Sequence, residues 1–420
     1  MRRIRAPSVV TDRALMKTIQ LKPGKERSAL RGHPWVFDTA IGKGRADAGE
    51  TVRVVSSEDR FLGWGAFSPT SKIRVRIWSF DESERIDEGF IERRLQAAWT
   101  MRLRLGIASN AWRWVHAEAD GLPGLIVDRY DDTLCAQFLS SGAERFKPMI
   151  AQALMQISGL RRIHERSDSG VRQLEGLEPI KGWLRKPDSD DGHTALSITE
   201  HEMQLTLDVS EGHKTGYYLD QRDARWRFQQ VVAQRRCQRV LNCYGYTGGF
   251  SVAALLGMKS VGMLNDQAQV ITIDSSAPAL QRAQAHLELN GVAGPHAQFW
   301  DADVNASLRR LIQEGQQFDA IVLDPPKFAP TAAHAERAAR AYKDINRLAL
   351  KLLSPGGVLF TYSCSGGIGA ELFHKIVASA GTDAQVDGYI SERFFAAPDH
   401  PMTLCFPEGE YLKGLMVIKK

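Results

Sequence analysis

The feature that most constrains the fold is an alternation of short apolar runs and amphipathic segments, which starts near residue 200. The apolar runs, which predict strands, are residues 240–242, 270–274, 299–300, 318–324 and 357–362. The helix expected after the second run has clear ends, because Ser276 is a suitable N-cap and Gly291 follows its last residue. Strands that alternate with helices in this way form a parallel, doubly wound α/β sheet.

A polar residue stands at or just beyond the end of each successive predicted strand. In chain order these residues are Asn242, Asp274, Asp303, Asp324 and Cys364. Because ligands of open parallel sheets bind beyond the carboxyl ends of the strands, the series predicts a site along that edge. A single acid at a strand end is more often a helix cap, so the prediction depends on the whole series.

The turn after the first of these strands, Asn242-Cys-Tyr-Gly-Tyr-Thr-Gly-Gly-Phe-Ser, predicts close approach of backbone N–H groups to a ligand. It has neither the Gly-x-Gly-x-x-Gly spacing of dinucleotide-binding folds nor the Gly-Lys-Ser/Thr of a triphosphate loop. We choose Asp274, which directly precedes the capped helix, as the acid that accepts hydrogen bonds from ribose hydroxyls. Asp266 is its rival, and the choice of Asp274 predicts an enlarged loop at residues 258–269.

The first 80 residues differ from the rest in charge and in pattern. They carry 16 Lys and Arg against 7 Asp and Glu, whereas the other 340 residues carry 38 against 42. Alternation at residues 51–55 and 72–78 predicts a small β barrel, with Arg53, Arg74 and Arg76 on its outer face. The basic excess fits a polyanionic partner and an ordinary solvated surface equally well.

The middle of the chain predicts a mixed α+β domain. Residues 89–105 have an apolar residue at every fourth position, which indicates an amphipathic helix. Strands are expected around residues 124–128, 134–139 and 162–166, and a second helix at 146–158. We expect neither a membrane-spanning helix nor a secretory signal. The five cysteines include no Cys-x-x-Cys pair, so we predict a cytoplasmic protein without a disulfide framework or a metal site.

Longer motifs resemble those of the bacterial large-subunit ribosomal RNA cytosine-C5 methyltransferases, the family called ribosomal RNA large subunit methyltransferase I. In the carboxyl half they are Gly212-His-Lys-Thr-Gly-Tyr-Tyr-Leu-Asp-Gln-Arg, the glycine-rich turn, Asp324-Pro-Pro-Lys-Phe, Tyr342-Lys-Asp-Ile-Asn, Ser363-Cys-Ser-Gly, Asp399-His-Pro and Pro407-Glu-Gly-Glu-Tyr-Leu-Lys-Gly. In the amino half, Lys22-Pro-Gly-Lys-Glu-Arg-Ser resembles the family's RNA-binding PUA domain, and Ala119-Asp-Gly-Leu-Pro-Gly resembles its central domain.

The resemblance implies four parts in the chain. They are an extension at residues 1–16, a PUA-like domain at 17–82, a central α+β domain at 89–198 and a Rossmann-like class I methyltransferase domain at 200–420. The resemblance also implies S-adenosylmethionine as the cofactor, large-subunit (23S) ribosomal RNA as the partner and carbon 5 of a cytosine as the methyl acceptor. It implies no membrane partner, and a homodimer is compatible with this fold.

The resemblance assigns catalytic roles to two residues. Cys364 would add as a thiolate to carbon 6 of the cytosine, and Asp324 would hydrogen-bond the exocyclic amine and N3 edge of the base. Lys327 stands where some RNA cytosine-C5 methyltransferases have a second cysteine, which implies a mechanism with one cysteine. The group that removes the C5 proton stays open.

Binding roles follow for two further sets. The cofactor set is Tyr218, Gln221, Arg222, Asn242, Tyr244, Tyr246, Thr247, Gly248, Gly249, Phe250, Asp274, Ser275, Asp303 and Asp324, and the substrate set is Pro325, Pro326, Lys327 and Phe328. Asp301 competes with Asp303 for the adenine amine. Of the other cysteines, Cys135, Cys237 and Cys405 are expected to be buried and structural, and Cys243 has no evident chemistry.

Two other classes of function stay open. Methyltransferases that modify adenine N6 or guanine N2 also begin their catalytic loop with Asp-Pro-Pro and an aromatic residue, but they need no thiol at the next strand end. Cys364 therefore disfavours them, and it disfavours a guanine-N7 methyltransferase in the same way. A noncatalytic RNA-binding assembly factor would not need the complete series of cofactor positions.

Overall fold

The computed structural model describes residues 16–212, 215–328 and 335–420. The chain forms two compact units, unit 1 and unit 2. Unit 1 comprises the residues up to 196 together with 207–217 and 399–409, and unit 2 comprises residues 197–206, 218–398 and 410–420. Residues 1–15 of the predicted extension, and His213 and Lys214 of the first family motif, lie outside the described residues.

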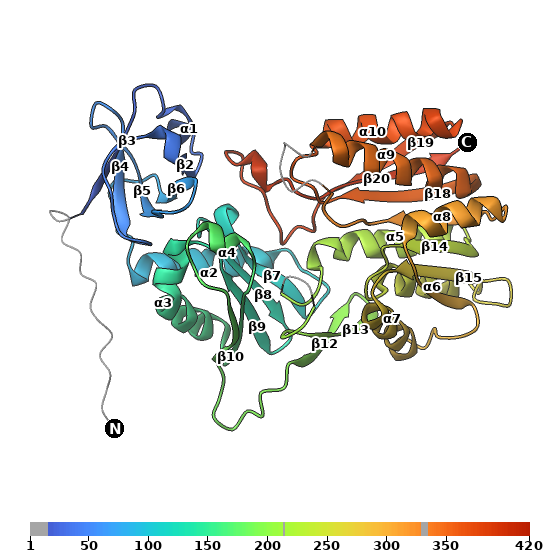
Figure 1. Ribbon diagram of the computed structural model, residues 1–420. Coiled ribbons are helices and arrows are strands. Elements are labelled where there is room, and N and C mark those ends of the chain that lie inside the picture. Colours follow the sequence, from blue (N-terminus) through green and yellow to red (C-terminus); the bar gives the residue numbers. More distant parts are fainter. Residues whose placement is uncertain (1–15, 213–214, 329–334) are drawn as a thin grey trace. The chain divides into compact units, whose positions relative to one another are not determined.

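A seven-stranded mixed sheet is the centre of unit 2 (Figure 1). Its strands are β14 (Arg239–Cys243), β15 (Gln269–Asp274), β16 (Ala297–Asp301), β17 (Phe318–Leu323), β18 (Leu353–Ser363), β19 (Gly388–Phe394) and β20 (Lys413–Lys419). Their order in the sheet is β16-β15-β14-β17-β18-β20-β19. The first five strands in that order run parallel, and β20 is antiparallel to both of its neighbours. The order reverses between β14 and β17, which is where such sheets bind ligands.

Helices cover both faces of this sheet (Figure 1). One group contains α5 (Arg222–Gln234), α6 (Gly249–Ser260) and α7 (Ala277–Leu289), and the other contains α8 (Val304–Gln313), α9 (Ala335–Leu352) and α10 (Ala370–Ala384). Helix α7 begins as predicted, with the Ser276 side chain accepting a hydrogen bond from the Ala279 N–H. The prediction of a loop at residues 258–269 was wrong at both ends. Met258 is fully buried in the last turn of α6, so the helix continues to Ser260 and the loop covers only residues 261–268.

Unit 1 contains a six-stranded and a five-stranded sheet. The first has the order β2-β6-β5-β4-β1-β3 and consists of β1 (Thr18–Leu21), β2 (Trp35–Phe37), β3 (Ile41–Lys43), β4 (Thr51–Val55), β5 (Phe61–Phe67) and β6 (Ile73–Ser79). The second has the order β11-β10-β9-β8-β7 and consists of β7 (Ala111–His116), β8 (Leu125–Tyr130), β9 (Thr133–Phe138), β10 (Arg162–Ser167) and β11 (Ile180–Arg185). One apolar core lies within the first sheet, and a second core, on the second sheet, also includes Trp64, Ala66 and Trp78 of the first.

The helices of unit 1 are α1 (Arg27–Leu30), α2 (Glu88–Arg104), α3 (Ser141–Ser158) and α4 (Val171–Leu174). Helix α2 confirms the predicted helix at residues 89–105. Helix α3 starts five residues earlier than the predicted 146–158, because the Ser140 hydroxyl caps it by accepting from the Ala143 N–H at 3.2 Å. A two-stranded sheet of β12 (Ala195–Glu200) and β13 (Met203–Asp208) completes the strands. Among the described residues, no helix is long and apolar enough to cross a membrane.

The three arginines predicted on the outer face of the barrel occupy different environments. Arg53 is partly exposed and pairs with Glu82 at 3.0 Å, and Arg74 donates to the Ser68 carbonyl at 3.0 Å. Arg76 is only 9% exposed and forms an ion pair with Glu175. The prediction was therefore wrong for Arg76, because an acid 99 residues later in the chain covers the outer side of that strand.

Candidate active site

The polar residues predicted at the strand ends lie along one edge of the sheet in unit 2. Strands β14, β15, β16, β17 and β18 are parallel and in register, so their carboxyl ends meet at the same edge. Asp274 is paired directly with Asp301 at the ends of β15 and β16. Asp324 follows β17 directly, and Cys364 follows β18. Each predicted apolar run ends within one residue of the observed strand, so the polar residues that follow the runs lie at this edge.

The glycine-rich turn packs closely against β15. A Cβ atom on Gly245 would lie 2.4 Å from the Thr272 side chain, so only glycine fits at that position. Tyr246 has a positive φ of 45°, and its N–H donates to Asp274 Oδ2 at 2.8 Å. The other oxygen of Asp274 accepts from the Ser276 N–H at 3.0 Å. Asp274 thus holds the turn and the start of α7, and each carboxylate oxygen still has a lone pair for a ligand hydroxyl.

The rival acid, Asp266, lies elsewhere. It is exposed in the loop that precedes β15, at the amino end of that strand, whereas the other predicted groups lie at the carboxyl ends. The choice between Asp303 and Asp301 as the partner of the adenine amine stays open. Asp303 is exposed and caps α8 by accepting from the Ala306 N–H at 2.8 Å, and Asp301 is exposed as well. Ser275 is also exposed, directly after Asp274.

Buried residues that the sequence analysis did not identify stabilise the glycine-rich turn. Ser251 accepts a hydrogen bond from the Asn242 side-chain amide at 2.8 Å and lies 2.7 Å from the Thr272 hydroxyl. His286 is fully buried in α7, where Nδ1 donates to the Thr247 carbonyl at 2.8 Å and Nε2 accepts from the Thr206 N–H at 3.0 Å. The one available signal for His286 was its place on the apolar face of a predicted helix.

The segment just before α5 carries the predicted covering residues. The rings of Tyr218 and Tyr246 meet edge to face with their centroids 5.5 Å apart. Burial raises the pKa of Tyr218, and nearby Tyr246, Asp324 and Cys364 raise it further. Arg222 is buried and donates from Nε to Asp223 at 3.1 Å.

Two buried side-chain amides at this edge of the sheet are suited to bind a polar cofactor. Gln221 is 3% exposed, and neither its side-chain oxygen nor its nitrogen has a hydrogen-bond partner among the described residues. The side-chain oxygen of Asn242 is likewise buried and without a partner there. Buried polar atoms are nearly always hydrogen-bonded in folded proteins, so these amides fit a site that a polar ligand completes.

The two predicted catalytic residues lie together on the β17–β18 side of the edge. The Cys364 thiol donates to the Pro325 carbonyl, with 3.7 Å between Sγ and the oxygen. Asp324 is half-buried and its N–H reaches the Cys243 carbonyl at 3.5 Å. Pro326 and Lys327 are exposed, and the ring of Phe328 lies 4.8 Å from that of Tyr342. The thiol therefore faces the Asp-Pro-Pro segment, to which the sequence assigned the substrate base.

Three of the other four cysteines differ from Cys364 in burial. Cys135, Cys237 and Cys243 are buried, and burial raises the pKa of each thiol, to about 12 for Cys237. Cys405 is half-buried, so the prediction that it is a buried residue was wrong. It lies in residues 399–409, which belong to unit 1, and its Sγ is 3.6 Å from the Thr403 hydroxyl.

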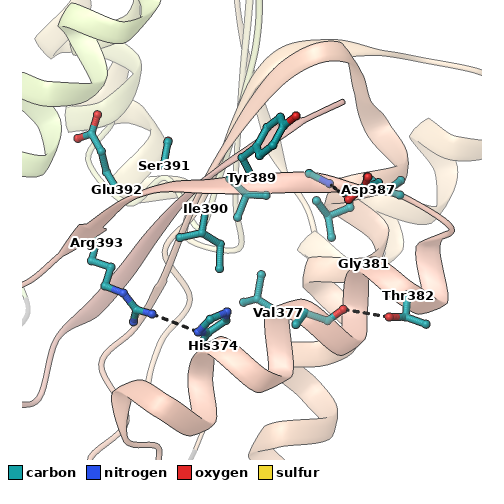
Figure 2. A pocket seen from close by; sticks show the side chains of 15 residues that line it. His374, Val377, Gly381, Thr382, Asp387, Tyr389, Ile390, Ser391, Glu392 and Arg393 are labelled. Carbon is teal, nitrogen blue, oxygen red and sulfur yellow. Dashed lines mark hydrogen bonds between the residues drawn. The ribbon is translucent and has the colours of Figure 1, made fainter.

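A separate cavity of about 960 Å³ lies between α10 and the edge strand β19 (Figure 2). Its floor is apolar, with Val377 and Ile390, and at one end Arg393 donates to His374 Nδ1 at 3.1 Å. None of the predicted site residues lines it. The cavity is thus distinct from the series of strand ends.

Comparisons with known proteins agree with this geometry. Residues 19–80 match the PUA-like domain family, and residues 182–403 match the S-adenosylmethionine-dependent methyltransferase family. The chain is 44% identical over 409 residues to ribosomal RNA large subunit methyltransferase I of Klebsiella pneumoniae, covering 96% of this chain and 98% of that protein. It is 44% identical over 402 residues to the protein of the same name from Escherichia coli, covering 94% and 97%.

Solved structures support the fold. A protein from Streptococcus mutans described as a SAM-dependent methyltransferase superposes with a TM-score of 0.80 at 19% identity, over 96% of this chain and all of that one. A methyltransferase structure complexed with SAH gives 0.81 at 20% identity, with the same coverage. The predicted α/β methyltransferase fold with a PUA-like domain before it is confirmed, and so is the predicted cofactor, S-adenosylmethionine.

Proposed function

The chain belongs to the ribosomal RNA large subunit methyltransferase I family, and from that premise we propose that it methylates carbon 5 of a cytosine in large-subunit ribosomal RNA. The relatives' name supports the class of RNA. The choice of cytosine C5 depends on the residues at the β17–β18 side of the edge. The proposal includes a covalent bond between Cys364 and the base.

The chemistry requires a nucleophile because carbon 5 of cytosine does not attack a methyl donor unaided. The Cys364 thiolate adds to carbon 6, and the electron pair of the C5–C6 double bond becomes available at carbon 5. S-adenosylmethionine supplies the electrophilic methyl group. After transfer, a protein base or a water molecule takes the proton from carbon 5, the electrons of that C–H bond re-form the double bond, and Cys364 leaves as the thiolate.

The observation that carries the proposal is the contact of 3.7 Å between Cys364 Sγ and the Pro325 carbonyl oxygen. It sets the nucleophile beside the segment that would hold the base. Asp324, half-buried before two prolines that restrict the backbone, would accept a hydrogen bond from the exocyclic amine of cytosine. An amino-group methyltransferase would have no use for a thiol at this position.

The amino-terminal part supports RNA as the partner. Residues 1–80 have a net charge of +9, and the PUA-like match covers most of them. Lys22, Lys25, Arg31 and Lys43 are exposed there. Exposed cations of this kind neutralise phosphates and release counterions, which contributes to affinity without doing chemistry.

Bisulfite sequencing of ribosomal RNA from cells with and without this protein tests the proposal. We expect one or more cytosines of large-subunit RNA to resist deamination only when the protein is present. Methylation found instead on adenine N6 or guanine N2, with every cytosine converted, would overturn the cytosine-C5 assignment. Absence of any methyl transfer to RNA would favour an assembly factor.

A further inference from the structure

One buried cation near Cys364 has no part in the chemistry described so far. Lys413 is the first residue of β20 and is 3% exposed. It pairs directly with Ser363, the residue before Cys364, in the antiparallel ladder of β18 and β20. Its Nζ donates to the Ser365 carbonyl at 3.0 Å and to the Tyr411 carbonyl at 2.9 Å. Lys413 therefore contacts the chain on both sides of the thiol.

No ion pair within the described part of the chain neutralises the charge of Lys413. Among the described residues, no carboxylate oxygen lies within 4.0 Å of its Nζ, and its two hydrogen-bond acceptors are neutral carbonyls. Burial lowers the pKa of Lys413, whereas Glu410 and Cys364 raise it and Lys327 lowers it. Burying a cation without a carboxylate partner costs free energy, and a neutral donor would hydrogen-bond the two carbonyls equally well.

Tyr342 holds the same short segment from the other side. Its hydroxyl lies 3.0 Å from the Ser365 hydroxyl, and the Ser365 N–H reaches Ser363 Oγ at 3.4 Å. Ser363, Ser365 and Tyr342 are all fully buried. Cys364 thus lies between two fully buried serines, while it is itself half-buried.

We propose that Lys413 is a positioning residue, which fixes the peptide after Cys364 and stabilises the Cys364 thiolate with its positive charge. The inference rests on the proposed function, because it concerns the nucleophile assigned there. Thiols beside a lysine ionise at lower pH than free thiols, and the thiolate is the reactive form. Other charged or titratable groups near the thiol and Lys413 are Asp324, Lys327, Glu410, Tyr218 and Tyr342.

The test measures the ionisation of Cys364 directly. Iodoacetamide labelling of Cys364 in the full-length protein, followed by mass spectrometry across pH 6 to 10, gives the midpoint of the reactive form. We expect Lys413→Met to raise this midpoint by about one pH unit or more, and Lys413→Arg to stay near the wild type. Lys413→Gln, which keeps a neutral donor, serves where methionine lowers the melting temperature.

Lys419 offers a matched control on the same strand. It is half-buried, and it also donates to two carbonyls, of Leu350 and Leu353, but at the opposite end of β20. Lys419→Met should leave the midpoint unchanged. An unchanged midpoint in folded Lys413→Met or Lys413→Gln protein overturns the inference, as does an equal shift in Lys419→Met.

Methyl transfer gives a second readout that a structural role alone would not move. In Lys413→Met the pH profile of kcat should shift upward with the labelling midpoint, while the affinity for S-adenosylmethionine stays close to the wild type. The labelling needs no RNA, so it is separable from the proposed function. A shifted midpoint together with failure of the wild type to form an adduct with 5-fluorocytosine RNA would reject the proposed function and retain the electrostatic coupling.

Discussion

Cys243 and Cys364 lie at the carboxyl ends of two strands of the same sheet, yet their surroundings are opposite. Cys243 is the last residue of β14, is fully buried in the apolar core and has its pKa raised by that burial. Cys364 lies one residue beyond β18, is half-buried and has Lys413 bonded to the residue after it. A position one residue beyond the end of the strand is enough to place the thiol outside the apolar core. We therefore expect the β14 side to hold the cofactor through backbone and carboxylate, and the β18 side to supply the nucleophile.

Removing the Cys364 thiol should produce the largest difference between the two ends. Cys364→Ala should lower turnover by about a thousandfold or more, because an obligatory covalent bond is lost, while S-adenosylmethionine binding is retained. RNA with 5-fluorocytosine at the target should trap the wild type as a denaturant-resistant adduct, because fluorine does not leave as a proton does, but should not trap Cys364→Ala.

Buried cysteines provide the control. Cys135→Ala and Cys237→Ala should still form the adduct, and so should Cys405→Ala, since none of these thiols lies at the edge of the sheet. Near-normal turnover by folded Cys364→Ala would contradict the covalent mechanism and favour an amino-group methyltransferase.

The β14 side should respond to a different change. Asp274→Ala removes the acceptor of two backbone hydrogen bonds and of the proposed ribose contact, so S-adenosylmethionine affinity should fall tenfold or more, about 1.5–3 kcal/mol. Asp266→Ala, an exposed acid at the other end of β15, is the matched control and should bind normally. Calorimetric titration decides between them. Normal affinity in Asp274→Ala with a loss in Asp266→Ala would show that the wrong acid was chosen.

The features predictable from the sequence are those set by local pattern. The parallel strands appear as uninterrupted apolar runs, and polar residues must follow where each run leaves the core, so Asp274, Asp324 and Cys364 could be placed at one edge. The N-cap of α7 was visible in the same way, because Ser276 and its partner Ala279 are three residues apart.

Features that depend on distant parts of the chain could not be predicted. Lys413 meets Ser365 across 48 residues, and His286 meets Thr206 across 80. Lys413 lies in the motif at residues 407–414 and His286 on the apolar face of a helix, but neither pattern indicates the distant partner. The error at Arg76 has the same origin, because strand alternation shows which face a residue occupies but not what covers that face.

The smallest expected effect is a pH dependence on the cofactor side. Burial lowers the pKa of His286, so the folded protein keeps this ring neutral, whereas the unfolded chain protonates it near pH 6.5. A group whose pKa is lowered by folding contributes stability above its unfolded pKa, and that contribution is lost as the pH falls below about 6.5. Protonation would also remove the acceptor that Nε2 offers to the Thr206 N–H, although the new Nε2–H would face the Thr206 carbonyl at 2.9 Å. The free energy of unfolding should therefore decline between pH 6.5 and 5 by at most about 1.4 kcal/mol per pH unit from this residue.

His286→Gln does not titrate, so its denaturation midpoint and its S-adenosylmethionine affinity should fall less steeply over that range than in the wild type. Parallel declines in the two proteins would show that His286 does not titrate with unfolding, and that the β14 side, unlike the thiol side, has no pH-sensitive support.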